Sequence, residues 1–135
     1  MQRVIKSFTK RERKLKRTQQ YIFDNFLPIY GINSPQDFIF SDQQKKITLE
    51  IGFGNGENLF FLARKYPERF FVGIEVYKQG IVHLLSLLEK YLIQNVKIYY
   101  NEATHILQFI PDEILHEILI FFLTRGKKND IIKDA

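Results

Sequence analysis

Glycines and acidic residues follow two apolar runs of the sequence in an arrangement that could bind a nucleoside. Gly52, Gly54 and Gly56 come directly after the first run, residues 47–51, and glycines at such a turn let the backbone approach a ligand closely. Glu50 lies near the end of that run, and Glu75 ends the next one. An acid at this second place can accept hydrogen bonds from both hydroxyls of a ribose. The pattern indicates a cofactor that contains adenosine and carries no 2′-phosphate.

Glu102 extends this candidate site, because it follows the third apolar run and could accept a hydrogen bond from an adenine amino group. All three acids also have a simpler interpretation, in which they are solvated residues at the ends of strands. For Glu102 the two interpretations weigh the same. For Glu50 and Glu75, which flank the glycine turn, the ligand interpretation is favoured.

A regular alternation of strands and helices would place these residues at one edge of a sheet. The expected strands are 47–51, 70–75, 96–100 and 117–122, and the expected helices are 57–65, 78–92 and 103–109. This alternation predicts an α/β fold with a doubly wound, mostly parallel sheet. Ligands of such sheets bind beyond the carboxyl ends of the strands, which is where the glycines and acids are expected.

A basic arm, a helix and a linker precede this domain. Residues 1–20 carry eight Lys and Arg against one acid, residues 21–122 carry eight against twelve, and residues 123–135 carry four against two. Apolar spacing predicts a helix over 19–30, which contains Pro28 and ends at Gly31, and then a linker. A basic arm beside an acidic body suggests a polyanionic partner, with a solvated terminus as an equal alternative. The candidate RNA contacts are Arg11, Arg13, Lys14, Lys16 and Arg17.

The composition argues against several other classes of site. The chain has no cysteine, so it can form neither a disulfide nor a thiolate metal site, and its three histidines are scattered. We therefore expect no metal, and we interpret His83, His105 and His116 as surface or packing residues. No apolar run approaches the length of a membrane span. With 135 residues, 45% of them apolar, we expect a monomeric cytoplasmic protein with a single core.

Two motifs carry a resemblance to a known family. Residues 49–56 read Leu-Glu-Ile-Gly-Phe-Gly-Asn-Gly, and residues 71–76 read Phe-Val-Gly-Ile-Glu-Val. With Phe53 between the glycines, these motifs resemble the cofactor signature of bacterial tRNA (guanine-N7)-methyltransferases. The arm is similar to the basic N-terminal extension of that family, so the likeness covers about residues 3 to 122.

The resemblance implies a Rossmann-like fold, S-adenosylmethionine as the cofactor and tRNA as the partner. It implies that Glu50, Glu75 and Glu102 contact the cofactor together with the glycine turn, although the family usually has aspartate at the last position. The family reaction transfers a methyl group from the sulfonium sulfur to N7 of guanine 46 in tRNA. Because N7 carries no proton, the attacking atom needs no general base, and catalysis consists mostly of positioning and desolvation.

The resemblance ends after Phe122. The family continues Pro-Asp-Pro-Trp, with the aspartate counted as catalytic, whereas this chain continues Leu-Thr-Arg-Gly and places Thr124 at that position. The codons TTC-CTG-ACC-CGT-GGN would encode residues 122–126, and in another frame they contain CCT-GAC-CCG-TGG, which encodes Pro-Asp-Pro-Trp. Our hypothesis is that one base was lost near the codons of Phe121 and Phe122.

This hypothesis divides the chain into residues 1–46 (arm, helix and linker), 47–122 (a partial cofactor domain, the N-terminal half only) and 123–135 (an out-of-frame tail). We expect little or no activity, because the family's catalytic aspartate is replaced. We also expect the apolar strand near residues 116–122 to have an unpaired edge. Two alternatives stay open: a non-catalytic module that binds RNA or cofactor, and the non-functional product of a decaying gene.

Overall fold

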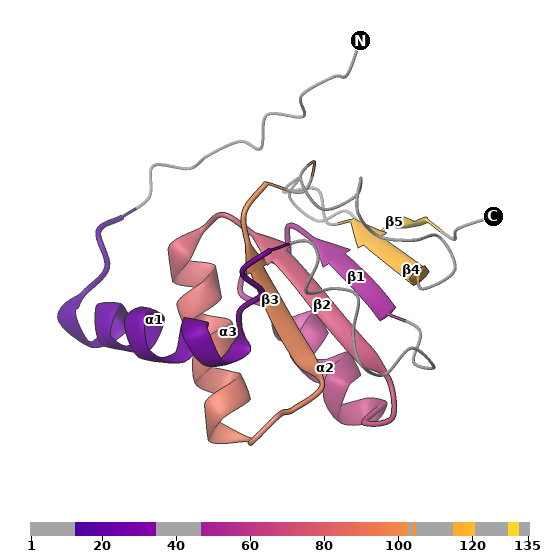
Figure 1. The fold of residues 1–135 in the computed structure, drawn as a ribbon, viewed down its shortest axis with the longest axis horizontal. Helices are drawn as coiled ribbons and strands as arrows, with labels where there is room; N and C mark the ends of the chain where they lie inside the picture. Colours follow the sequence, from indigo (N-terminus) through magenta and orange to yellow (C-terminus); the bar gives the residue numbers. More distant parts are fainter. Residues whose placement is uncertain (1–12, 35–46, 103, 105–114, 121–129, 133–135) are drawn as a thin grey trace, which may run out of the picture.

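The computed structural model describes residues 13–34, 47–102, 104, 115–120 and 130–132, which contain a five-stranded sheet with the strand order β3-β2-β1-β4-β5 (Figure 1). The strands β1 to β4 run parallel to one another, and β5 is antiparallel to β4. Their bounds are Ile47–Ile51 for β1, Phe70–Glu75 for β2, Val96–Tyr100 for β3, Leu115–Ile120 for β4 and Asp130–Ile132 for β5. The predicted mostly parallel α/β sheet is confirmed.

Three described helices pack on one face of the sheet: α1 (Arg17–Tyr30), α2 (Glu57–Lys65) and α3 (Lys78–Lys90). Leu59 of α2 and Leu84 and Leu88 of α3 are fully buried there, together with Phe71 of β2 and Ile98 of β3. Apolar residues of α2 and α3 recur every three or four positions, so each helix presents one apolar stripe to the sheet.

The opposite face of the sheet has its own buried cluster. Ile47 and Leu49 of β1 and Val72 and Ile74 of β2 contribute alternate residues to it, each no more than 2% exposed. Because successive side chains of a strand point to opposite faces, β1 and β2 are buried on both. Burial on both faces is typical of central parallel strands, and in β1 it includes the polar residues Thr48 and Glu50.

The helix α1 is joined to the far edge of the sheet. The Gly31 N–H donates to the Leu27 carbonyl at 2.6 Å and ends the helix, and the Ile32 N–H donates to the Ile98 carbonyl of β3 at 2.8 Å. The Tyr30 hydroxyl donates to Glu89 Oε2 of α3 at 2.9 Å. The predicted linker therefore starts with residues that are paired to β3, and Ile32 is buried.

Most of the predicted boundaries that the structure describes are confirmed to the residue, and three differ. The helix α1 begins at Arg17 rather than at residue 19. The helix α3 ends at Lys90 rather than at residue 92, because Leu92 adopts a left-handed backbone conformation with φ of 52° that no helix can continue through. The strand β4 begins at Leu115, two residues before its predicted start. The helix predicted over 103–109 lies outside the described residues except for Thr104.

The prediction that the fourth strand has an unpaired edge is wrong. The strand β5 pairs with β4 in an antiparallel register that joins Ile118 to Ile132, Leu119 to Ile131 and Ile120 to Asp130. Residues 130–132 show no alternation of apolar and polar side chains, so they were not predicted as a strand. They do contain two adjacent isoleucines, which favour extended backbone. In the described part of the chain, no helix combines the length and apolar character that crossing a bilayer requires.

Candidate functional site

The turn between β1 and α2 depends on three glycines with left-handed backbone. Gly52, Gly54 and Gly56 have φ of 70°, 62° and 76°, values that other residues adopt only with strain. At Gly56 a Cβ would also lie 2.8 Å from the Leu84 side chain, so this glycine lets α2 and α3 approach each other. At Gly54 a Cβ would meet nothing within 4 Å. The turn therefore leaves open space beside the backbone of Gly54.

The first turn of α3 supports the glycine turn from one side. Gly80 is buried, and a Cβ on it would collide with the Gly54 carbonyl oxygen. This glycine was not predicted as part of the site, because it lies inside a helix where only the folded packing shows its purpose. Its small size allows α3 to begin directly against the turn.

Glu75 connects the end of β2 to the glycine turn. Its Oε1 accepts a hydrogen bond from the Gly54 N–H at 2.8 Å, and its Oε2 accepts from the N–H groups of Val76 at 2.8 Å and Tyr77 at 3.2 Å. The side chain is buried. A carboxylate offers about four acceptor positions, so these contacts occupy three of them. Glu75 thus fixes the turn and retains capacity at Oε1 for one further donor.

Glu50 lies inside the domain beneath the same turn. The residue has no exposed surface, and its Oε1 accepts a hydrogen bond from Asn58 Nδ2 at 3.2 Å. Its Oε2 is buried without a hydrogen-bond partner, which is unusual because buried polar atoms are normally paired. Burial raises the pKa of the Glu50 carboxyl to about 8, the Asn58 hydrogen bond lowers it, and the charge of Glu75 raises it further.

When its carboxyl is ionised, the orphaned oxygen of Glu50 is an acceptor, as is the unfilled position of Glu75, and both lie near the carboxyl ends of neighbouring strands. Glu50 is the penultimate residue of β1 and is paired with Gly73, and Glu75 is the last residue of β2, so the two acids lie near the same ends of adjacent strands. Donors such as the ribose hydroxyls and the amino group of a cofactor fit this set. Asn58, in the first turn of α2, was missed by sequence reasoning, although an amide directly after a glycine turn was a usable signal.

Glu102 has a different environment. It lies two residues beyond β3, its side chain is exposed, and its backbone N–H donates to Asn101 Oδ1 at 2.7 Å. In the sheet register Tyr100 is paired with Glu75, so Glu102 is on the same edge of the sheet as the glycine turn. Its predicted contact with adenine stays a prediction.

The basic residues predicted for RNA lie at the start of α1. Arg13, Lys14, Lys16 and Arg17 are exposed, and Gln79 Nε2 of α3 donates to the Arg13 carbonyl at 3.4 Å. Because Gln79 is in the first turn of α3, this contact places the start of α1 near the edge that carries Glu75. Arg11 and Thr124 lie outside the described residues.

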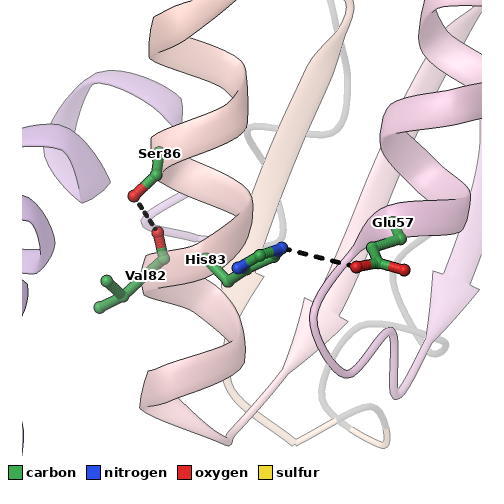
Figure 2. A network of polar contacts seen from close by, with 4 residues as sticks. All are labelled: Glu57, Val82, His83 and Ser86. Carbon is green, nitrogen blue, oxygen red and sulfur yellow. Dashed lines mark hydrogen bonds and ion pairs between the residues drawn. The ribbon is translucent and has the colours of Figure 1, made fainter.

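Of the three histidines predicted to be surface or packing residues, His83 lies beside an acid. His83 Nε2 of α3 lies 3.7 Å from Glu57 Oε1, and the two side chains are 46% and 78% exposed. Figure 2 shows the imidazole reaching from α3 toward the first turn of α2, one turn away from the Ser86 hydroxyl, which donates to the Val82 carbonyl at 2.8 Å. The surface interpretation of His83 is confirmed. His105 and the side chain of His116 lie outside the described residues.

In the part of the chain that the structure describes, no group of three or more potential ligands could hold a metal ion.

Comparison with known proteins adds independent findings. A family model described as "Putative methyltransferase" matches residues 44–124. The tRNA (guanine-N(7)-)-methyltransferase of Nitrosococcus oceani is 41% identical over 126 residues, which cover 89% of this chain and 53% of the relative. The protein of the same name from Methylococcus capsulatus is 38% identical over 143 aligned residues, covering 98% of this chain and 62% of the relative.

Solved structures agree on the fold. A precorrin-6y C5,15-methyltransferase from Geobacter metallireducens is 15% identical, with a TM-score of 0.50, over 83% of this chain and 51% of its own. An antibiotic-related methyltransferase is 21% identical, with a TM-score of 0.50, over 70% of this chain and 50% of its own. At such identities the likeness shows the fold alone. The chain spans about half the length of the curated relatives that it matches.

Proposed function

Because this chain belongs to the methyltransferase family whose model matches residues 44–124, we propose that it binds S-adenosylmethionine at the glycine turn, as the cofactor-binding part of a tRNA (guanine-N7)-methyltransferase. The observation that carries the proposal is the acceptor set around that turn. A buried Glu50 oxygen without a partner lies beneath the turn, and Glu75 is fixed to the Gly54 N–H beside it. The names of relatives 32–41% identical to this chain support the choice of tRNA as the substrate.

The bound cofactor would supply an electrophilic methyl group on a sulfonium sulfur. Glu75 would accept a ribose hydroxyl at Oε1, because its other acceptor positions already bind backbone N–H groups. Glu50 Oε2 would accept from a cationic donor such as the amino group. The open space at Gly54 would admit the ligand against the backbone. None of these residues needs to take a proton from guanine N7, so their work is binding and orientation.

The acid residues differ in what they are expected to do when the ligand arrives. Burial and the nearby charge of Glu75 raise the pKa of Glu50 to about 8, against the lowering effect of the Asn58 hydrogen bond, so this carboxyl is mostly protonated at neutral pH. A cationic donor at Oε2 would favour the ionised form. The affinity for the cofactor should therefore increase as the pH rises toward 8, by up to tenfold per unit.

The tail supports a second proposal, in which the chain binds the cofactor without transferring its methyl group. Thr124 stands where the resemblance places the family's catalytic aspartate, and a threonine hydroxyl has no charge to hold the guanine. The frameshift hypothesis for residues 123–135 belongs with this proposal. Sequencing the transcripts through codons 121–135 tests it, because the alternative frame must then encode Pro-Asp-Pro-Trp.

Calorimetry tests the binding proposal. We expect S-adenosylmethionine to bind the chain, and Glu75→Gln to lower its affinity at least tenfold, because the amide replaces one of the two accepting oxygens with an NH2 donor. Glu68→Gln, at an exposed acid in the loop before β2, is the matched control and should leave the affinity unchanged. Equal affinity of the three proteins would contradict the site.

A transfer assay distinguishes the two proposals. Tritiated S-adenosylmethionine is incubated with the chain and an unmodified tRNA transcript, and a transcript with adenine at position 46 is the control. Label that depends on guanine 46 supports the enzyme and rejects the binding module. Cofactor binding without label supports the module.

A further inference from the structure

Basic side chains gather at the end of the domain that is opposite the glycine turn. Arg64 and Lys65 lie in the last turn of α2, Arg69 follows in the loop before β2, and Lys90 ends α3. These four residues are half of the eight Lys and Arg in residues 21–122. Together with the aromatic rings that they contact, we call them the basic-aromatic patch. That segment has twelve acids, so such a concentration of positive charge is unexpected in it.

The acids that neighbour these four cations in the sequence are too few to neutralise them. Glu68 is the acid between Lys65 and Arg69, and it is exposed. Glu89 precedes Lys90, but its Oε2 accepts the Tyr30 hydroxyl on the side of α1. The described residues of the patch thus present more positive than negative charge to solvent.

Aromatic rings hold these cations in place. The Arg64 guanidinium lies 5.3 Å from the ring centroid of Phe60 and 4.8 Å from that of Tyr91, and the two rings are 5.0 Å apart. Lys90 Nζ lies 5.5 Å from the Tyr91 ring. A cation within about 6 Å of a ring centroid is attracted by the ring face. One set of contacts therefore joins the ends of α2 and α3.

A second set extends the same surface toward β2. Arg69 Cζ lies 4.3 Å from the centroid of the Tyr66 ring, and Lys65 Nζ lies 5.5 Å from it. Lys65 Nζ is also 5.8 Å from the Phe61 ring, which is 59% exposed. The four cations are exposed while their positions are defined by rings, so they can bind a polyanion with little further ordering.

A groove of about 370 Å³ opens within the patch. Its lining includes Ala63, Arg64, Pro67, Leu92 and Asn95. This volume is in the range of sites that hold a small organic group. Leu92 is 75% exposed and has the left-handed φ of 52°, which is an unfavourable conformation for a branched residue. The groove therefore combines an apolar wall with a fixed guanidinium at its edge.

Helix ends account for only part of this arrangement. Arg64, Lys65 and Lys90 lie in last turns, where cations complement the helix dipole. That explanation covers neither Arg69 nor the exposure of Phe61, Tyr91 and Leu92, which are 59%, 43% and 75% exposed. Exposed rings interleaved with cations are typical of surfaces that bind single-stranded nucleic acid, where bases stack and phosphates pair with Lys and Arg.

We propose that the basic-aromatic patch is a second contact for RNA, in which its cations bind phosphates and the groove accepts an unpaired base. This inference rests on the proposed function, which supplies a tRNA as the ligand. The strands between the patch and the glycine turn have five or six residues, which span about 17–20 Å. Only a ligand as large as a folded RNA would reach both ends of the sheet.

Salt-dependent binding tests the inference. The probe is a fluorescein-labelled, unmodified tRNA transcript, whose anisotropy is followed from 50 to 200 mM NaCl with wild type, Arg64→Gln, Arg69→Gln and the double variant. The control, Lys97→Gln, removes one positive charge at β3, where Lys97 Nζ donates to the Ile29 carbonyl at 3.2 Å. Circular dichroism melts confirm that each variant is folded.

The double variant should bind roughly ten- to a hundredfold more weakly at 100 mM NaCl, and the slope of log K against log salt should fall by about 1.4 to 1.8. The Lys97→Gln slope should match wild type. Crosslinking with a 4-thiouridine transcript should label peptides from residues 60–69 or 90–95, without any variant being needed.

Three results would overturn the inference. The first is a double variant with the slope of wild type, and the second is crosslinks that lie only in other segments. The third is a wild-type dimer that the double variant converts to monomer, because the patch would then contact a second copy. Calorimetry with S-adenosylmethionine keeps the two proposals apart. If wild type binds the cofactor and the double variant keeps the wild-type salt slope, the patch alone is rejected. If wild type binds neither the cofactor nor tRNA, the proposed function is rejected.

Discussion

Replacing Glu50 with glutamine should change how the stability of the protein depends on pH. The carboxyl has no exposed surface, and its pKa rises from the ordinary value of 4.5 to about 8, mainly because burial disfavours the charged form. Between these two values the folded chain keeps a proton that the unfolded chain releases. The free energy of unfolding must therefore fall as the pH rises from about 4.5 to about 8, and it must level off above 8.

The size of this effect follows from the shift. A difference of about 3.5 pKa units at about 1.4 kcal/mol per unit gives an upper limit of about 5 kcal/mol, which is comparable to the whole stability of many domains. Glutamine has the same shape, keeps an oxygen that can accept from Asn58 Nδ2, and has no charge to desolvate. Glu50→Gln should equal wild type near pH 5 and be more stable by a few kcal/mol at pH 9.

Urea unfolding at several pH values from 5 to 9 measures this difference, followed by circular dichroism or by tyrosine fluorescence, since the chain has no tryptophan. Glu68→Gln serves as the control, because this exposed acid should change neither the stability nor its slope against pH. Parallel curves for wild type and Glu50→Gln would refute the reasoning. So would a Glu50→Gln protein that is less stable at every pH, because the carboxyl would then be ionised and paired in the folded chain.

Other substitutions test single features of the structure. Gly54→Ala should cost about 1–2 kcal/mol in urea unfolding because of its left-handed backbone, and it should abolish S-adenosylmethionine binding in calorimetry by filling the open space; retained affinity would contradict that placement. Tyr30→Phe should cost about 1–2 kcal/mol by removing the bond to Glu89. Because the pKa of Tyr30 is raised to about 12, wild type should lose stability between pH 10 and 12 and Tyr30→Phe should not, as alkaline melting curves would show. Asn95→Ala should cost about 1–3 kcal/mol, because its amide donates to the carbonyls of Ala63 and Tyr66 at the end of α2 and of Arg69 in the loop before β2; an unchanged urea midpoint would count against this.

The sequence predicted the central elements because their signals were local. Glycines at 52, 54 and 56 mark the turn, short runs rich in apolar residues mark β1 and β2, and helical spacing of apolar residues marks α2, so these boundaries match to the residue. The end of α3 was misplaced because nothing in the apolar spacing shows that Leu92 takes a left-handed φ. A short strand such as β5 exists only through its pairing with β4, which no local pattern reveals.

The site was predicted by residue type but not by its interactions. Glu50 and Glu75 were recognised from their places at strand ends. That Glu75 is bound by three backbone N–H groups, while Glu50 keeps an unpaired oxygen, follows from the packing of the turn. Gly80 and the basic-aromatic patch were missed, because Gly80 packs against Gly54 and Arg64 against Tyr91, and each pair is more than twenty positions apart in the chain.

The most direct test of the central claim is a titration of ¹⁵N-labelled chain with S-adenosylmethionine, followed by amide chemical shifts. The amides of Gly54, Val76 and Tyr77 should shift together and saturate with one equivalent, because they surround the Glu75 carboxylate. The same residues should respond to S-adenosylhomocysteine. The claim would be contradicted by a saturating titration that leaves these amides unchanged, or by shifts confined to the groove around Asn95.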